Sequence, residues 1–411
     1  MNLLIKNIGC LMGILPQEVG RLVGKEMNSV GRIENAWLAV EGEKIHSFGK
    51  METCPETREA EIVDARGGIV IPAFCDSHSH LVWAGDRAGE FIDKINGLSY
   101  EEIAARGGGI LNSADRLNAA SEDELFEAAH RRLRQVMALG TGAIEIKSGY
   151  GLTLEGELKM LRVINRLRQA EPSVEIRSTF LGAHAVGRAY AGRQAEYVDH
   201  IINEMLPAVS SLADFVDVFC DKGFFTVDET SRILSAAAVL KLPPKIHANE
   251  LDVSGGVQVG IRHNAVSVDH LERIGDEEIE ALAASPTVAT MLPGASFFLG
   301  MPYAPAKAAI AGGCTVALAS DYNPGSSPSG SMPFVMSLAA IKMKLLPEQA
   351  LNAVTLNGAA AMNMSDTIGS ITPGKFASFI LYKPYVPSLA YIVQNYSEPT
   401  IGAVYLKGRQ I

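Results

Sequence analysis

Residues 69–80 read Ile-Val-Ile-Pro-Ala-Phe-Cys-Asp-Ser-His-Ser-His, an apolar run followed at once by polar residues. The run Ile69–Phe74 has the length and composition of a buried strand. Beyond it, His78 and His80 are two positions apart. Residues with that spacing face the same side of an extended chain, so both imidazoles can bind one metal ion. The segment therefore predicts a strand that ends in a metal-binding pair.

The pattern of an apolar strand followed by a helix repeats along the next 300 or so residues. Seven more strand candidates follow the first one: Ala143–Ile146, Val174–Phe180, Phe215–Phe219, Lys245–His247, Ala265–Val268, Val288–Leu292 and Thr315–Ala319. The clearest helix candidates lie between them: Ser121–Leu139, Leu154–Gln169, Glu196–Leu206, Asp228–Leu240 and Asp276–Ala284. Eight such strands separated by helices predict an α/β fold, with a parallel sheet closed into a distorted (β/α)8 barrel of the TIM type.

The two ends of the chain have a different pattern from the middle. Short segments rich in β-forming residues occur at Asn2–Asn7, Ala36–Val40 and Lys44–Phe48, and again at Ser378–Tyr382 and Ile401–Lys407. Neither end has enough apolar residues to fold alone. We therefore expect the ends to pair into one small composite β-sandwich domain, formed by residues 1–67 and 365–411, with a barrel domain at 68–364 inserted between them.

Composition restricts the class of protein. The chain has 411 residues, of which 47% are hydrophobic and 20% charged, and its formal net charge is -10. The acidic balance argues against nucleic acid or an anionic membrane as partner. No apolar stretch reaches the roughly 20 residues that span a bilayer, so a cytoplasmic location is expected.

The five cysteines are scattered and form no CxxC pair, which argues against disulfides or a cysteine metal site. Symmetry preferences favour a homodimer.

Polar residues gather where the predicted strands end, which is where the active sites of such barrels form. Five of the nine histidines lie at strand ends: His78, His80, His184, His247 and His270. Asp321 follows the eighth strand. With Asp321, the histidines at 78, 80 and 247 offer three nitrogen ligands and one oxygen ligand. That set suits zinc or iron and leaves room for water.

Plainer interpretations exist for several of these residues. His184 and His270 could be core histidines with satisfied hydrogen bonds, and Glu250 could be an ordinary loop carboxylate. Asp76 and Asp269 are expected to be structural, with Asp269 orienting its neighbour. The other histidines are expected to lie outside the site: His46, His130, His200 and His263.

At these positions the sequence resembles the amidohydrolase superfamily. Residues 72–80 resemble the metal-binding motif of its first strand. The likeness continues through much of the barrel, at residues 80–87, Gly107–Ile110, 145–152, 157–161, 179–186, 217–220, 245–250, 269–271, 292–294 and 321–326. It is loose near both ends of the chain. Departures occur at Trp83, at residues 187–190 and at residues 376–378, none of which is an expected metal ligand.

The resemblance implies one metal ion per subunit, zinc or iron, with four ligands: His78, His80, His247 and Asp321. It implies seven contacts to substrate: Arg87, Tyr150, His184, Glu250, Asn323, Gly325 and Ser326. It also implies that His270 lies near the reacting centre. Because Lys147 is on the second strand and not the fourth, a carboxylated lysine that bridges two metals is not expected.

We therefore expect a metal-dependent hydrolase that opens a small cyclic amide carrying a carboxylate. Arg87 would bind the carboxylate through its fork of donors. Asp321, Glu250 and His270 are equal candidates for the proton transfers. One alternative is another single-metal amidohydrolase, such as a nucleobase or guanidine-type deaminase, which would release ammonia. A more remote alternative is a non-catalytic barrel that serves as a scaffold.

Overall fold

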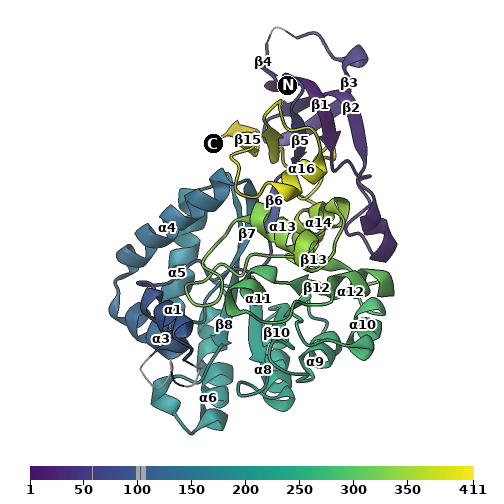
Figure 1. Cartoon of the computed structure of the whole chain (residues 1–411). Coiled ribbons are helices and arrows are strands. Elements are labelled where there is room, and N and C mark those ends of the chain that lie inside the picture. Colours follow the sequence, from purple (N-terminus) through teal and green to yellow (C-terminus); the bar gives the residue numbers. More distant parts are fainter. Residues whose placement is uncertain (58, 99–101, 103–107) are drawn as a thin grey trace.

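The computed structural model describes residues 1–57, 59–98, 102 and 108–411, so Gly107 of the resemblance lies outside the described residues. A barrel of strands and helices forms the larger body, and a small sheet at one end of it holds both chain termini (Figure 1). In the described part of the chain, no helix is both long and apolar enough to cross a membrane.

The barrel contains eight parallel strands in chain order, as the sequence predicted. They are β6 (Phe74–Asp76), β7 (Thr141–Lys147), β8 (Glu175–Ala183), β9 (Phe215–Cys220), β10 (Pro244–Ala248), β11 (Ser267–His270), β12 (Val288–Met291) and β13 (Val316–Leu318). Each strand pairs with its sequence neighbour, and every residue of the eight is buried except Glu175, Arg177 and Pro244. The carboxyl ends of all eight strands therefore lie at one mouth of the barrel.

The barrel closes between its first and last strands by contacts just beyond them. Within the described residues no backbone ladder joins β13 directly to β6. Instead, Asp76 accepts hydrogen bonds from the amide and the hydroxyl of Ser320, at 2.9 and 2.5 Å. The amide of Asp321 donates to the carbonyl of His78 at 3.0 Å. The segments that carry three of the four expected metal ligands, His78, His80 and Asp321, thus form the seam of the barrel.

The prediction that Ile69–Phe74 forms one strand of the barrel was wrong, because the segment is divided between two sheets. Its first part is β5 (Ile69–Pro72), which lies in the small sheet, and only Phe74 belongs to β6. The chain changes sheets at Ala73, whose amide donates to Ser378, while the amide of Phe74 donates to Gly140. Pro72 has no amide hydrogen to continue a ladder. A run of apolar residues predicts that a strand is buried, but it does not predict to which sheet the strand belongs.

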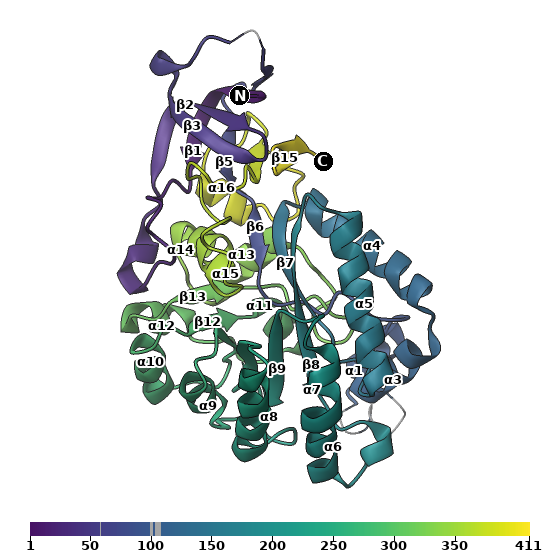
Figure 2. The same ribbon diagram turned by 180° about the vertical axis from the view of Figure 1, so that it is seen from behind.

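The small sheet joins both ends of the chain, as expected. Its strands are β1 (Leu3–Met12), β2 (Arg32–Glu41), β3 (Lys44–Lys50), β4 (Glu61–Asp64), β5, β14 (Phe379–Tyr382), β15 (Ile401–Leu406) and β16 (Arg409–Gln410). The order is β16-β15-β14-β5-β1-β2-β3, and β4 pairs with β1. Viewed from behind, this sheet lies beyond the amino-terminal ends of the barrel strands (Figure 2). The division at residues 67 and 364 stays a prediction.

The helices cover the outside of the barrel (Figure 2). Those of the described residues are α1 (Ala88–Ile95), α3 (Gly109–Ala119), α4 (Glu122–Ala138), α5 (Leu154–Ala170), α6 (Gln194–His200), α7 (Leu206–Val209), α8 (Val227–Val239), α9 (Gly256–Arg262), α10 (Asp276–Ala283), α11 (Pro293–Leu299), α12 (Ala306–Gly312), α13 (Met332–Lys342), α14 (Pro347–Val354), α15 (Leu356–Ala360) and α16 (Leu389–Gln394). A capping box formed by Ser121 and Glu124 begins α4, at the residue where the sequence predicted the helix to start. The helix predicted at Glu196–Leu206 is interrupted by one π-helical turn, Ile201–Met205.

Candidate metal centre and active site

The four expected metal ligands meet at the seam of the barrel. Oδ1 of Asp321 lies 3.5 Å from Nε2 of His78 and 3.5 Å from Nε2 of His80. Nε2 of His247 lies 3.4 Å from Nε2 of His80. All four side chains are buried. Two overlapping groups of side chains in this site lie close enough together to hold an ion. One is His78 with His80 and Asp321, and the other is His78 with His247 and His270.

The chemistry of this donor set fits a metal ion. Nε2 of His78 is buried and, among the described residues, has no hydrogen-bond partner. A buried polar atom is normally paired, so its place in the site calls for a ligand. Burial lowers the pKa of His247 to about 4 and holds the pKa values of His78 and His80 well below their usual range. Neutral imidazoles keep the lone pair that a metal requires.

Buried carboxylates orient two of the histidines. Nδ1 of His78 donates to Oδ2 of Asp269 at 2.6 Å. Nδ1 of His247 lies 2.9 Å from Oδ2 of Asp217. Both arrangements direct Nε2 towards the site, as second-shell carboxylates do around metals. Asp269 was expected to orient its neighbour, but its partner is His78. Asp217 was not expected to have this role, although it is a charge inside an apolar strand and belongs to residues 217–220 of the resemblance.

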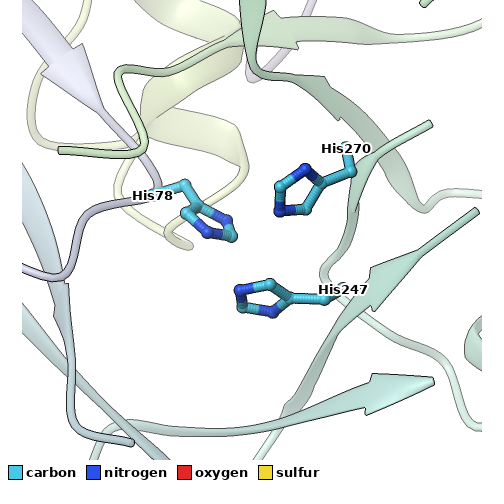
Figure 3. A group of neighbouring side chains, drawn as sticks. All are labelled: His78, His247 and His270. Carbon is cyan, nitrogen blue, oxygen red and sulfur yellow. The ribbon is translucent and has the colours of Figure 1, made fainter. Parts of the chain in front are cut away.

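His270 lies beside the ligands but has different surroundings. The rings of His78 after β6, His247 of β10 and His270 of β11 face a common space (Figure 3). Nδ1 of His270 is 3.7 Å from carboxylate oxygens of both Glu250 and Glu272. Burial alone lowers the pKa of His270, but the two carboxylates outweigh it and raise the pKa to about 10. A protonated imidazole has no lone pair for a metal, which favours His80 and Asp321 as the remaining ligands.

Glu250 and Asp321 also have shifted pKa values. Burial raises the pKa of Glu250 to about 7 and that of Asp321 to about 6. A carboxylate with a pKa near neutrality can both accept and release a proton during turnover. Glu272 was missed by the sequence analysis. It is buried and accepts a hydrogen bond from the hydroxyl of Ser296 at 3.0 Å.

A cavity of about 790 Å³ opens beside the metal ligands. All seven expected substrate contacts line it: Arg87, Tyr150, His184, Glu250, Asn323, Gly325 and Ser326. His80, His247 and Asp321 line it as well, so the ligands and the substrate contacts share one space. Trp83 is also part of its wall, whereas residues 187–190 and 376–378 are not.

Arg87 is held at the start of α1 by an ion pair. Its Nε and Nη2 donate to Oε2 of Glu90 at 2.7 and 2.5 Å. Its Nη1 packs so closely on Gly325 that a Cβ there would lie 1.9 Å away. Glu90 also accepts from the amide of Gly109 at 3.2 Å, which ties α1 to the start of α3. The sequence analysis did not single out Glu90.

The loop after β13 is shaped by Asn323. Its Oδ1 accepts hydrogen bonds from the amides of Gly325 and Ser326, each at 2.8 Å. Its Nδ2 donates to the carbonyl of Asp321 at 2.6 Å and to the hydroxyl of Ser326 at 2.7 Å. Elsewhere in the cavity wall, Nδ1 of His184 pairs with the carbonyl of Gly149 at 2.9 Å. These bonds fix the cavity wall next to the metal ligands.

The chain is similar to a known protein family over most of its length. The model of the amidohydrolase family matches residues 69–411, which is most of the chain. The chain therefore belongs to the amidohydrolase family, whose members are metal-dependent hydrolases. Relatives that match over the full length of the chain show to which group of this family it belongs. A protein of Christiangramia forsetii named imidazolonepropionase is 50% identical over 413 residues and covers 100% of both chains. The same name belongs to a Flavobacterium johnsoniae protein with the same identity and coverage.

A more distant relative has the same name. An imidazolonepropionase of Clostridium tetani is 43% identical over 377 residues, which are 90% of this chain and 89% of the other. Identity at this level over nearly the whole length shows close kinship. Within the amidohydrolases, the chain thus belongs to the imidazolonepropionases, hydrolases of carbon–nitrogen bonds.

Solved structures support the fold independently. An adenosine deaminase from Xanthomonas campestris with bound zinc superimposes with a TM-score of 0.70 at 16% identity, covering 100% of this chain and 92% of the other. The guanine deaminase of E. coli gives a TM-score of 0.74 at 14% identity, covering 99% and 98%. At such low identity these likenesses concern the fold alone.

Proposed function

We propose that this protein hydrolyses the ring amide of 4-imidazolone-5-propanoate and forms N-formimidoyl-L-glutamate, a step of histidine breakdown. The imidazolonepropionase relatives support this substrate through their name. The observation that carries the proposal is the meeting of four buried metal-ligating groups beside a cavity that also contains Arg87. An arginine there gives an acidic protein the local cation that an anionic substrate needs.

We propose one metal ion, zinc or iron, held by His78, His80, His247 and Asp321. When bound, such an ion lowers the pKa of water and polarises a carbonyl group. The nitrogen and oxygen ligand types of this set suit both zinc and iron.

Protein groups handle the protons of the reaction. Water supplies the oxygen that bonds to the lactam carbon, the ring C–N bond breaks, and the ring nitrogen takes up a proton. Glu250 accepts the proton from water at its carboxylate and passes it to the leaving nitrogen. Protonated His270 donates a hydrogen bond to the oxygen on which negative charge develops. Asp321 is a second candidate for the proton transfer.

Substrate binding uses the rest of the cavity wall. The guanidinium of Arg87 pairs with the propanoate group, which is a charge-assisted and potentially bidentate contact. Tyr150 and His184, whose rings lie 5.4 Å apart, orient the substrate ring. Gly325 keeps space next to Arg87, since no side chain projects there.

Turnover of the purified holoenzyme with imidazolonepropanoate tests the proposal. We expect N-formimidoyl-L-glutamate as the product, no ammonia, and one metal ion per chain by elemental analysis. His78→Ala should lose metal and turnover together. Ammonia release from a nucleobase or guanidine compound would favour the deaminase alternative, and normal turnover without metal would refute the scheme. Cytoplasmic location and a homodimer stay predictions.

A further inference from the structure

Lys147 is a buried charge next to the site that the proposed mechanism does not use. It ends the second barrel strand, β7, and its side chain is 0% exposed. It does not line the cavity. Its Nζ lies 2.6 Å from Oε1 of Glu145, 2.8 Å from Oδ2 of Asp217 and 3.6 Å from Oδ2 of Asp269. An ammonium group so far from solvent requires a specific arrangement of partners.

Two of these partners contact the metal ligands directly. Asp217 Oδ2 is the atom that faces Nδ1 of His247 at 2.9 Å. Asp269 Oδ2 is the atom that accepts from Nδ1 of His78 at 2.6 Å. The same two oxygens face Lys147. The ammonium group of Lys147 is therefore linked to both histidines, to His247 through Asp217 and to His78 through Asp269.

From this geometry we infer that Lys147 is a positioning residue for the metal centre. Its charge fixes the two carboxylate oxygens, and these oxygens keep His78 and His247 oriented with Nε2 towards the ion. The inference rests on the metal site of the proposed function. It adds that the affinity for the ion depends on a residue that touches neither the ion nor the substrate. Outer partners of this kind commonly change metal affinity by about 10- to 100-fold.

A simpler role for Lys147 would be charge balance alone. The buried network also contains Lys245, whose Nζ pairs with Glu145 and donates to the carbonyl of Ser77 at 2.8 Å. Removal of Lys147 alone would leave buried carboxylates short of positive charge, and such a variant can fail to fold. A useful variant must therefore keep the network's charge while it removes the contact to Asp217 and Asp269.

Glu145 makes such a variant possible. Its carboxylate contacts Lys147, Lys245 and the hydroxyl of Thr179. The double variant Glu145→Gln with Lys147→Met removes one negative and one positive charge, so the net charge of the network stays the same. The single variant Glu145→Gln is the matched control, because it keeps Lys147 beside both aspartates. Lys375→Met is a second control, because Lys375 is also buried but donates to Ser370 at 2.8 Å.

The experiment measures Zn²⁺ affinity by chelator competition and the visible spectrum of the Co²⁺-loaded proteins. We expect the double variant to bind Zn²⁺ about 10- to 100-fold more weakly than the wild type. Its Co²⁺ bands should shift, because the imidazole ligands are less well oriented. Once it is saturated with metal, its KM should stay within about twofold of the wild type, because Lys147 is outside the cavity. Both controls should bind Zn²⁺ like the wild type.

Two results would overturn the inference. One is wild-type Zn²⁺ affinity and an unchanged Co²⁺ spectrum in the charge-balanced variant. The other is an equal loss of affinity in Glu145→Gln, which would mean that the network as a whole matters and Lys147 does not. If the double variant does not fold, Lys147→Arg replaces it. This variant keeps the buried positive charge but changes the position of the donors that face Asp217 and Asp269, so it should also weaken Zn²⁺ binding. A wild-type protein that binds no metal would instead contradict the proposed function itself.

Discussion

The backbone amide of His80 donates a hydrogen bond of 2.9 Å to the carbonyl of Tyr322. His80 follows the first barrel strand, and Tyr322 follows the last one. Ser79 and Tyr322 form a parallel bridge at the same place. The barrel is therefore closed by the segments that carry three of the four proposed metal ligands.

Metal removal should lower thermal stability, because the ion would connect the two sides of this seam. Metal at 100 times its dissociation constant stabilises the folded state by about 2.7 kcal/mol. For a large domain this corresponds to a Tm shift of roughly 5 °C. Thermal melts with and without a chelator measure the effect. His78→Ala should show no metal-dependent shift, and an identical Tm for both forms of the wild type would contradict the proposed site.

Replacement of Arg87 should weaken substrate binding more than the chemical step. A hydrogen bond to a charged group contributes about 1.5–3 kcal/mol, so Arg87→Met should lower kcat/KM by roughly 10- to 150-fold, mainly through KM. Steady-state kinetics measure this. An analogue in which a propyl group replaces the propanoate is the control, because its turnover should be equally poor in both enzymes. A variant with unchanged KM would show that another cation binds the carboxylate.

A side chain at Gly325 should disturb Arg87. The added Cβ of Gly325→Ala would lie 1.9 Å from Nη1 and 2.5 Å from Cζ of Arg87, so the guanidinium must move. We expect KM to rise by about tenfold, since a displaced donor loses much of its hydrogen bond. Gly89→Ala is the matched control, because Gly89 lies in α1 and nothing is within 4 Å of its Cβ position. That control should keep its KM and gain about 0.5–1 kcal/mol of stability.

Activity should depend on pH through Glu250. Burial raises the pKa of this carboxyl to about 7, so it is largely protonated below that pH. A general base must be deprotonated, so kcat/KM should rise about tenfold per pH unit up to about pH 7 and then level off. In Glu250→Gln, the rise of kcat/KM with pH should disappear, and kcat should fall by about 10²- to 10⁴-fold. If kcat/KM of the variant still rises with pH in this range, another group is the general base, and Asp321 is the next candidate.

The sequence by itself determined the elements and the end of the barrel where the chemistry lies. Alternation of apolar strands with capped helices is a local property, so seven of the eight barrel strands and the start of α4 at Ser121 could be predicted. Histidines at strand ends could be placed at one mouth, because parallel strands end together. The seven substrate contacts that line the cavity were expected from the family resemblance instead.

Only the tertiary structure decided which groups face one another. His78 and Asp269 are 191 positions apart, and no local pattern indicates that they are partners. The same holds for Lys147 and Asp217, which are 70 positions apart. The split of residues 69–76 between two sheets also depended on distant partners, since β5 pairs with β1 and β14. Local periodicity fixes which side chains are buried, whereas the path of the whole chain fixes what each buried charge contacts.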